Sequence, residues 1–228
     1  MHIIARIHND FPTKFGVPRQ SGLVDSIISR IVFEPEFRDP NALRGIEGYS
    51  HLWLMWRFDL PDIDEDENYW QPTVRPPRLG GNTRVGVFAS RSPFRPNRIG
   101  LSCVRLLSVV STQNEGTVLT VGGADLMDGT AIFDIKPYLP FTDSHPDAVG
   151  GFAAQFSDYS LEVDFPEELS AHIEPEKLPA LLGALSNDPR PSYHNDPERV
   201  YGLAYAGLNI RFRVADQTLT VISVEKLN

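Results

Sequence analysis

Arginines that could bind an anion gather in one part of this 228-residue chain. From Gln71 to Val110 the sequence has seven arginines and no aspartate, glutamate or lysine, although the whole chain carries a net charge of −9. Arginine binds phosphate and carboxylate groups through two parallel hydrogen bonds, and its planar guanidinium stacks on bases. We therefore predict that several of these arginines contact an anionic ligand or a nucleic acid, the alternative being a surface patch or salt bridges.

The densest part of this window is "VGVFASRSPFRPNRIGLS", residues 85–102, where three arginines and two prolines lie between two apolar runs. Three other polar clusters also border apolar runs. They are "KFGVPRQSGL" at 14–23, "GYSHLW" at 48–53 and "DLMDGTAIFDIKPYLP" at 125–140. Four such clusters in one chain favour a shared functional site.

Each of these clusters also has a structural interpretation. His51 has the setting of a half-buried strand histidine, and Asp128-Gly129-Thr130 is typical of a turn. Asp134 and Lys136 could form an ion pair, since residues i and i+2 of a strand share a face. The acidic block "DLPDIDEDE" at 59–67 is interpreted as a solvated loop.

Several familiar chemistries lack their signatures. There is no G-x-G-x-x-G after a strand, no phosphate-binding G-x-x-x-x-G-K-[ST], and no G-x-S-x-G nucleophile turn. The single cysteine, Cys103, excludes an internal disulfide framework and a cysteine-based zinc cluster, and its apolar run indicates a buried, inert thiol. Asp143, His145 and Asp147 resemble a capped turn, so we expect no metal.

The elements that must position these clusters are mostly strands. Short apolar or alternating runs, rich in Val, Ile and aromatic residues and separated by turn signals, favour an antiparallel or mixed barrel over a doubly wound sheet. These runs cover residues 2–9, 25–34, 49–59, 84–90, 101–110 and 117–126. The sequence "STQNEGT" places Asn114 and Gly116 in a hairpin loop between the last two runs.

The pattern of apolar residues in the sequence changes after about Phe156. Apolar residues at helical spacing predict one helix within "EPEKLPALLGALSNDPR", residues 174–190, and alternation predicts a final hairpin around Ala215-Asp216-Gln217. We therefore predict a β-rich α+β protein, with a barrel domain at 1–158 and a small α+β domain at 159–228. No apolar run approaches 18 residues and no signal peptide is evident, which indicates a cytoplasmic protein with no membrane partner.

In order and spacing, the four clusters resemble those of the TsaA-like family, also known as TrmO. The segments that carry the resemblance are "KFGVPRQSGLV", "GIEGYSHLWLMWRF", "GVFASRSPFRPNRIGLS" and "DLMDGTAIFDIKPYLPFTDS". The stretch from "DPRPSY" to "VYGL" resembles the small C-terminal domain of many members. Arg98 departs from the family, where a second proline is common at this place, and the acidic block at 59–67 is individual.

The resemblance implies a non-Rossmann β-barrel methyltransferase core, S-adenosylmethionine as methyl donor, and a homodimer with the donor near its interface. It implies methylation of N6 of threonylcarbamoyladenosine at position 37, beside the tRNA anticodon. Residues carried over to the donor site come from all four clusters. They are Pro18, Arg19, Gln20, His51, Leu52, Arg91, Leu101, Asp128, Gly129, Thr130 and Ala131.

Methyl transfer from a sulfonium is an in-line displacement, and the acceptor nitrogen must lose a proton. Asp134 and His51 are our candidates for accepting it. Arg84, Arg91, Arg95 and Arg98 would form a cationic rim for anticodon-loop phosphates, with Phe94 available to stack on a base and Lys136 nearby as a further cation. Two alternatives stay open: a non-catalytic RNA-binding module, and a small-molecule enzyme acting on an anionic metabolite.

Overall fold

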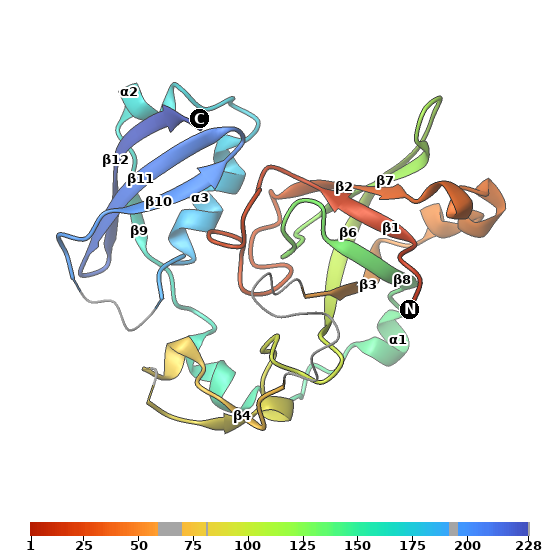
Figure 1. Ribbon diagram of the computed structural model, residues 1–228, viewed down its shortest axis with the longest axis horizontal. Helices are drawn as coiled ribbons and strands as arrows, with labels where there is room; N and C mark the ends of the chain where they lie inside the picture. The colour runs from red at the N-terminus through yellow and green to blue at the C-terminus, as the bar shows by residue number, and fades with distance from the viewer. Residues whose placement is uncertain (59–69, 81, 192–195, 228) are drawn as a thin grey trace.

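The larger part of the protein is a closed barrel of six strands (Figure 1). The computed structural model describes residues 1–58, 70–80, 82–191 and 196–227, so the acidic block at 59–67 lies outside the described residues. The barrel strands are β1 (Ala5–His8), β2 (Ile28–Phe33), β3 (His51–Arg57), β6 (Ile99–Thr112), β7 (Gly116–Gly122) and β8 (Ala131–Pro137). Neighbours are antiparallel around the order β1-β2-β7-β6-β3-β8, which confirms the predicted barrel.

Alternation of side chains explains why the barrel closes with this register. In β3, Leu52, Leu54 and Trp56 are buried and the residues between them are partly exposed. Because successive side chains of a strand point to opposite faces, a slip of one residue would turn this apolar set outward. The buried side chains of β3 share one core with those of the other barrel strands, such as Ile31 of β2 and Ile132 of β8.

Short elements fill the connections between the barrel strands. They are η1 (Pro35–Phe37), η2 (Pro40–Leu43), η3 (Ile46–Gly48), β4 (Thr73–Val74), η4 (Pro77–Leu79), β5 (Val85–Gly86), η5 (Val87–Ala89), α1 (Pro140–Asp143) and η6 (Gly151–Phe156). The two short strands β4 and β5 pair with each other, apart from the barrel. β5 begins the Arg loop, the name used here for residues 84–98, and its pairing with β4 holds that end of the loop.

The C-terminal part is a four-stranded sheet in the order β10-β11-β12-β9, with a helix against it (Figure 1). Its elements are β9 (Glu162–Asp164), α2 (Glu167–Ser170), α3 (Leu178–Ser186), β10 (Tyr201–Tyr205), β11 (Leu208–Ala215) and β12 (Thr218–Lys226). The predicted helix within 174–190 is present as α3, which is shorter, and the predicted final hairpin is confirmed by the pairing of Ala215 with Thr218. Among the described residues, no helix is long and apolar enough to span a membrane.

The core of the C-terminal sheet includes residues from the beginning of the chain. Phe11, Val24 and Ile27 are buried in the same cluster as α3 and the sheet. The rings of Phe11 and Tyr205 lie 4.9 Å apart, and a Cβ added to Gly183 of α3 would be 2.4 Å from Val24 Cγ1. The connection between β1 and β2, residues 9–27, therefore packs on both parts of the protein.

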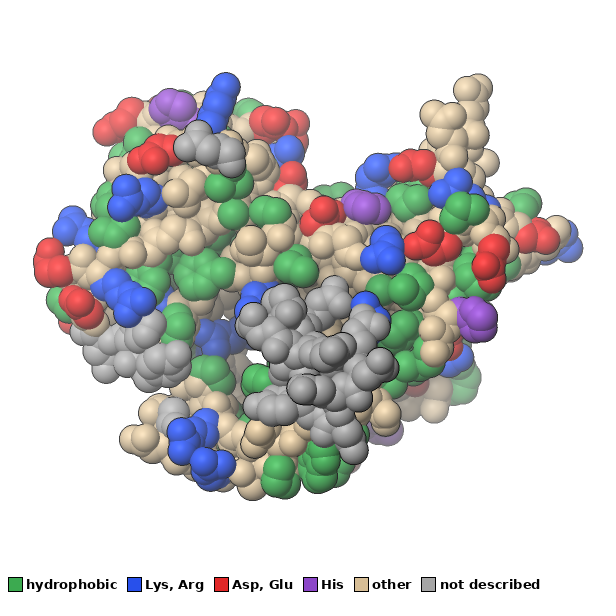
Figure 2. All heavy atoms as spheres, in the orientation of Figure 1, with side chains coloured by type: hydrophobic (Ala, Val, Ile, Leu, Met, Phe, Trp, Pro, Cys, Tyr) green, Lys and Arg blue, Asp and Glu red, His purple; other side chains and the backbone are tan. Residues whose placement is uncertain are grey.

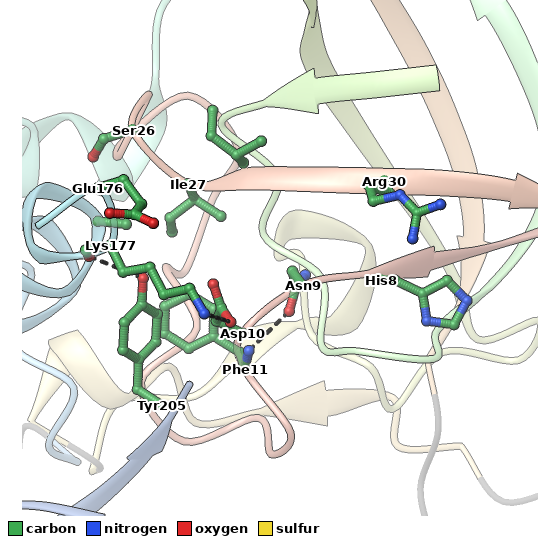
Figure 3. A pocket seen from close by; sticks show the side chains of 12 residues that line it. His8, Asn9, Asp10, Phe11, Ser26, Ile27, Arg30, Glu176, Lys177 and Tyr205 are labelled. Carbon is green, nitrogen blue, oxygen red and sulfur yellow. Dashed lines mark hydrogen bonds and ion pairs between the residues drawn. The ribbon is translucent and has the colours of Figure 1, made fainter. Parts of the chain in front are cut away.

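A groove of about 500 Å³ lies where these two parts meet (Figure 3). Phe11 and Tyr205 line it, and the Tyr205 hydroxyl donates to the Lys177 carbonyl at 3.0 Å. Its basic side chains face acids: Lys177 Nζ is 3.2 Å from Asp10 Oδ1, and Arg30 forms an ion pair with Glu115. We therefore interpret the groove as part of the contact between the barrel and the C-terminal sheet, and not as a ligand site.

Candidate active site

Three of the four polar clusters are brought to the same end of the barrel. The antiparallel order places the last residues of β1, β3 and β7 and the first residues of β2, β6 and β8 at this end, called the motif end below. The connections 9–27, 58–98 and 123–130 all leave from it. Backbone hydrogen bonds link them to one another or to the loop ends: Gly22 N to Gly123 O at 2.9 Å, Asp128 N to Phe11 O at 2.9 Å, and Phe58 N to Arg98 O at 2.9 Å.

The first cluster and the Arg loop meet through two predicted donor-site residues. Arg91 Nη1 donates a hydrogen bond to Gln20 Oε1, and Arg91 is otherwise exposed. This contact orients one face of the guanidinium and leaves its other N–H groups directed elsewhere. A guanidinium held in this way could bind a carboxylate group.

An acid to which the sequence analysis gave no role lies in the same region. Ser102 Oγ donates to Asp125 Oδ1, the backbone N–H of Ser21 donates to the same carboxyl group, and Trp56 Nε1 donates to Ser102 Oγ at 2.9 Å. Burial raises the pKa of Asp125, although the Ser102 hydrogen bond and the positive charge of Arg91 act in the opposite direction. The available signal was an acid placed inside the apolar run "TVGGADL".

Unlike its neighbour Gln20, Arg19 forms hydrogen bonds with the C-terminal part of the protein. Its Nη2 donates to the backbone carbonyls of Asp188 at 3.3 Å and Arg190 at 2.7 Å, in the segment that follows α3. Burial, with the nearby positive charge of Arg78, lowers the pKa of Arg19. Arg19 therefore holds the first cluster against the C-terminal domain, while Pro18 beside it is buried.

The turn at 128–131 reaches the motif end on the side of β1. Gly129 N donates to Ile7 O at 2.8 Å, and His8 Nδ1 lies 3.2 Å from Asp128 Oδ1. Thr130 and Ala131 are buried, so their side chains contribute packing and their backbone shapes the turn. The φ of Gly129 is +78°, in the left-handed region that favours glycine.

The remaining site candidates lie on the outer face of β6, β3 and β8. His51, Trp53 and Met55 lie on this face of β3. Leu52, between His51 and Trp53, points into the barrel. Leu101 and Asp134 are both paired with Met55 in register, and Lys136 is paired with Trp53.

Partners on this outer face restrict what its polar groups can do. Asp134 Oδ2 forms an ion pair with Lys136 Nζ at 2.8 Å, which is the structural interpretation weighed above. His51 Nδ1 lies 2.9 Å from Ser50 Oγ. Asp134 pairs with Met55, which is four residues along β3 from His51. At a rise of about 3.3 Å per residue, about 13 Å of strand separates Asp134 from His51. One chain does not bring Asp134 and His51 to one point. Burial raises the pKa of the Cys103 thiol on the same face, in line with an inert cysteine.

Within the Arg loop, arginines hold the loop together as well as facing solvent. Arg95 donates to the carbonyls of Val87 at 3.1 Å and Ser90 at 2.7 Å, and it lies over the Phe88 ring at 5.6 Å. Arg84 is exposed and donates to Thr73 Oγ1 at 3.0 Å. Arg98 adopts a φ of +45°, and Phe94 is half-buried. In Figure 2, Lys and Arg side chains gather at the lower edge of the molecule, over the β4 segment.

Comparison with solved structures defines the class of protein. A structure entitled "Crystal structure of TrmO" superposes with a TM-score of 0.76 at 28% identity, covering 99% of each chain. A second, of TrmO from Pseudomonas aeruginosa, gives a TM-score of 0.72 at 28% identity over 98% of each chain. The barrel with its attached sheet is thus the fold of these TrmO structures.

Sequence comparison then identifies the family. The family model for the tRNA-methyltransferase O N-terminal domain matches residues 6–144, and that for the TrmO C-terminal domain matches residues 158–227. The chain is 40% identical to the tRNA (adenine(37)-N6)-methyltransferase of Escherichia coli K12, over 97% of this chain and 96% of the relative. It is 46% identical to the enzyme of the same name from Eikenella corrodens, over 73% of this chain and 91% of the relative. The chain belongs to the tRNA-methyltransferase O family.

Proposed function

We propose that this protein is an enzyme that transfers the methyl group of S-adenosylmethionine to N6 of adenosine 37 in tRNA. The observation that carries the proposal is the meeting of three motif connections at one barrel end, where Gln20 contacts Arg91 beside Asp125. Full-length similarity to the E. coli enzyme of this activity supports it. A tRNA substrate favours a cytoplasmic location.

The residues at the motif end suit the methyl donor. Its carboxylate needs a cation, for which Arg91 is placed, and its polar groups need acceptors such as the Gln20 amide and the carbonyls of the turn at 128–131. Leu101 offers an exposed apolar surface for the adenine ring. Pro18, Thr130 and Ala131 are buried and would act through backbone groups and shape. Arg19 would position Gln20 through its bonds to the C-terminal domain.

We propose further that the active form is a homodimer whose sites combine two chains. The predicted donor residues lie on two surfaces of one chain: Gln20 and Arg91 in the loops of the motif end, and His51 on the outer face of β3. The outer face between them carries Leu101, Met55 and Trp53, an apolar set suited to an interface. A second copy would bring its outer face to the motif end of the first.

Mixed dimers test this arrangement. His51→Ala and Arg91→Ala proteins, each inactive alone, would form heterodimers in which one site has both defects and the other has neither. We expect the mixture to recover roughly a quarter of wild-type activity if subunits exchange at random. No recovery from a mixture shown to contain heterodimers would place both residues in one chain's site. A monomer by light scattering would end the dimer proposal.

The methylation itself is tested with a radiolabelled donor and two tRNA preparations, one bearing threonylcarbamoyladenosine and one unmodified. We expect label in tRNA, lost in the Arg91→Ala variant, and confined to the modified tRNA if the threonylcarbamoyl group is required. Label in neither, with donor binding intact by calorimetry, would favour the small-molecule enzyme. Salt-dependent RNA binding without donor binding would favour the non-catalytic module.

A further inference from the structure

We propose that the Asp125 carboxylate accepts the proton that leaves N6 of the target adenosine. The proposal rests on the methyltransferase function above and assigns its proton acceptor. Asp125 lies in the connection between β7 and β8 at the motif end, held by Ser102 and the Ser21 backbone. It is partly accessible, as an acceptor of a substrate proton must be, whereas Ser102 behind it is fully buried.

The balance of the reaction requires such a group. N6 attacks the methyl carbon, the carbon–sulfur bond breaks, and its electron pair stays on sulfur as a neutral thioether. N6 would keep a positive charge unless its proton leaves, and its lone pair is delocalised into the purine, which makes it a poor nucleophile while protonated. Transfer of that proton to the carboxylate turns sulfonium plus carboxylate into thioether plus carboxylic acid. Atoms and charge balance without another reactant.

Hydrogen bonds fix the orientation of the acid. The Ser102 hydroxyl accepts a bond from Trp56 Nε1 at 2.9 Å, so its single proton is available to donate to Asp125 Oδ1. Trp56 and Ser102 are both buried, so this chain of bonds is supported by the barrel core. Ser102 of β6 and the Ser21 backbone of the connection 9–27 therefore hold the Asp125 carboxyl group from different parts of the sequence.

Location separates Asp125 from the other candidates. It neighbours Arg91, whose contact with Gln20 marks the predicted donor site. Asp134 is ion-paired with Lys136 on the outer face of the barrel, where it pairs in register with Met55. His51 lies on the outer face of β3, whereas Ser102, which holds Asp125, is buried inside the barrel.

Charged groups around the segment set the direction of the pH dependence. Arg91 acts on the carboxyl group from the Arg loop. Asp25 and Arg105 lie beside the two preceding glycines: their Oδ1 and Nε are 3.3 Å and 3.7 Å from Cβ atoms added at Gly123 and Gly122. A proton acceptor works when ionised, so the methylation rate should rise with pH through the pKa of this acid.

The test is the pH dependence of single-turnover methylation in four variants. Asp125→Asn should lose roughly 10²- to 10⁴-fold in rate at its best pH while donor affinity by calorimetry stays within about threefold. Asp125→Glu should recover part of the rate. Asp25→Asn, the same change at an exposed acid near the site, should keep both the rate and the profile.

Ser102→Ala gives a result that a merely structural acid would not produce. Losing the hydroxyl removes a bond that favours the ionised carboxylate, so the acid side of the pH–rate profile should move to higher pH while the plateau is kept. An even loss of rate at all pH values, or an Asp125→Asn variant with more than a tenth of wild-type rate, would overturn the assignment. Failure of the wild type to methylate any tRNA would instead overturn the proposed function.

Discussion

Single residues at the motif end divide into those that hold the protein together and those placed to meet ligands. Arg19 and Arg95 each donate to two backbone carbonyls and so fix loops. Arg91 contacts one side-chain amide and is exposed, which leaves hydrogen-bond donors for a substrate. Residue type alone does not separate these roles, because all three are arginines in or next to predicted motifs.

Substitution of Arg91 should act on donor binding. A hydrogen bond to a charged group contributes about 1.5–3 kcal/mol, so Arg91→Ala should weaken the affinity for S-adenosylmethionine by roughly 10- to 100-fold. Arg91→Lys keeps the charge but loses the planar fork, so we expect an intermediate loss. Calorimetric titration measures both. Unchanged donor affinity in Arg91→Ala, with a folded protein, would exclude Arg91 from the donor site.

Asp125 should also make the free energy of unfolding depend on pH. Burial raises its pKa in the folded state above the unfolded value, so the folded protein binds more protons between those two values. The free energy of unfolding therefore falls as pH rises through this window, and the penalty is complete above the folded-state pKa. Asp125→Asn removes it, so the variant should have a higher unfolding free energy at neutral pH and should lose the dependence on pH across this window. Denaturant titrations at several pH values would show this, and a less stable variant at every pH would contradict it.

At the scale of elements, the connection 9–27 joins the site to the C-terminal domain. Its Phe11, Val24 and Ile27 belong to the core around α3, and its Gln20 belongs to the site. The connection has no helix or strand of its own, so packing and side-chain bonds define its path. The boundary at 158/159 stays a prediction, and the shared core indicates that the two parts depend on each other.

The contact between α3 and this connection gives a prediction with an unusual sign. Gly→Ala inside a helix normally stabilises by about 1 kcal/mol. At Gly183 the new Cβ would lie 2.4 Å from Val24 Cγ1, so Gly183→Ala should destabilise by about 1–3 kcal/mol. Val24→Ala alone leaves a cavity, but the double variant should lose less than the sum of the two. Additive losses in a double-mutant cycle would show that the two elements do not meet here.

At the scale of the whole molecule, charge is distributed unevenly. The window 71–110 carries +7, so the remainder of the chain carries −9 minus 7, or −16. Phosphates are repelled by an acidic surface, so an RNA should bind where the Arg loop and the β4 segment are exposed (Figure 2). The acidic remainder of the surface would disfavour RNA binding at other places on the protein.

Arg84 tests this distribution of charge. It is exposed and donates to Thr73 through Nη1, so Arg84→Ala should weaken tRNA binding without altering donor affinity. If it contacts a phosphate, the slope of log affinity against log salt should decrease by about 1. Binding measured at several salt concentrations gives the slope. An unchanged slope would remove Arg84 from the RNA surface.

The sequence by itself determined the barrel class, the C-terminal helix and final hairpin, and the four clusters. Alternation in runs such as "HLWLMWR" directly encodes which face of a strand is buried, and this is a local property. The Asp134–Lys136 ion pair was also accessible, because residues two apart on a strand share a face.

Only the tertiary structure decided which polar residues meet. Gln20 and Arg91, or Ser102 and Asp125, are brought together by strand order and barrel closure, which no local pattern encodes. The same closure turns His51 to the outer face of the barrel, opposite Arg105, which also pairs with Gly122 at the end of β7. It also half-buries Asp125 beside Ser102, and an acid's pKa depends on that burial rather than on its neighbours in sequence.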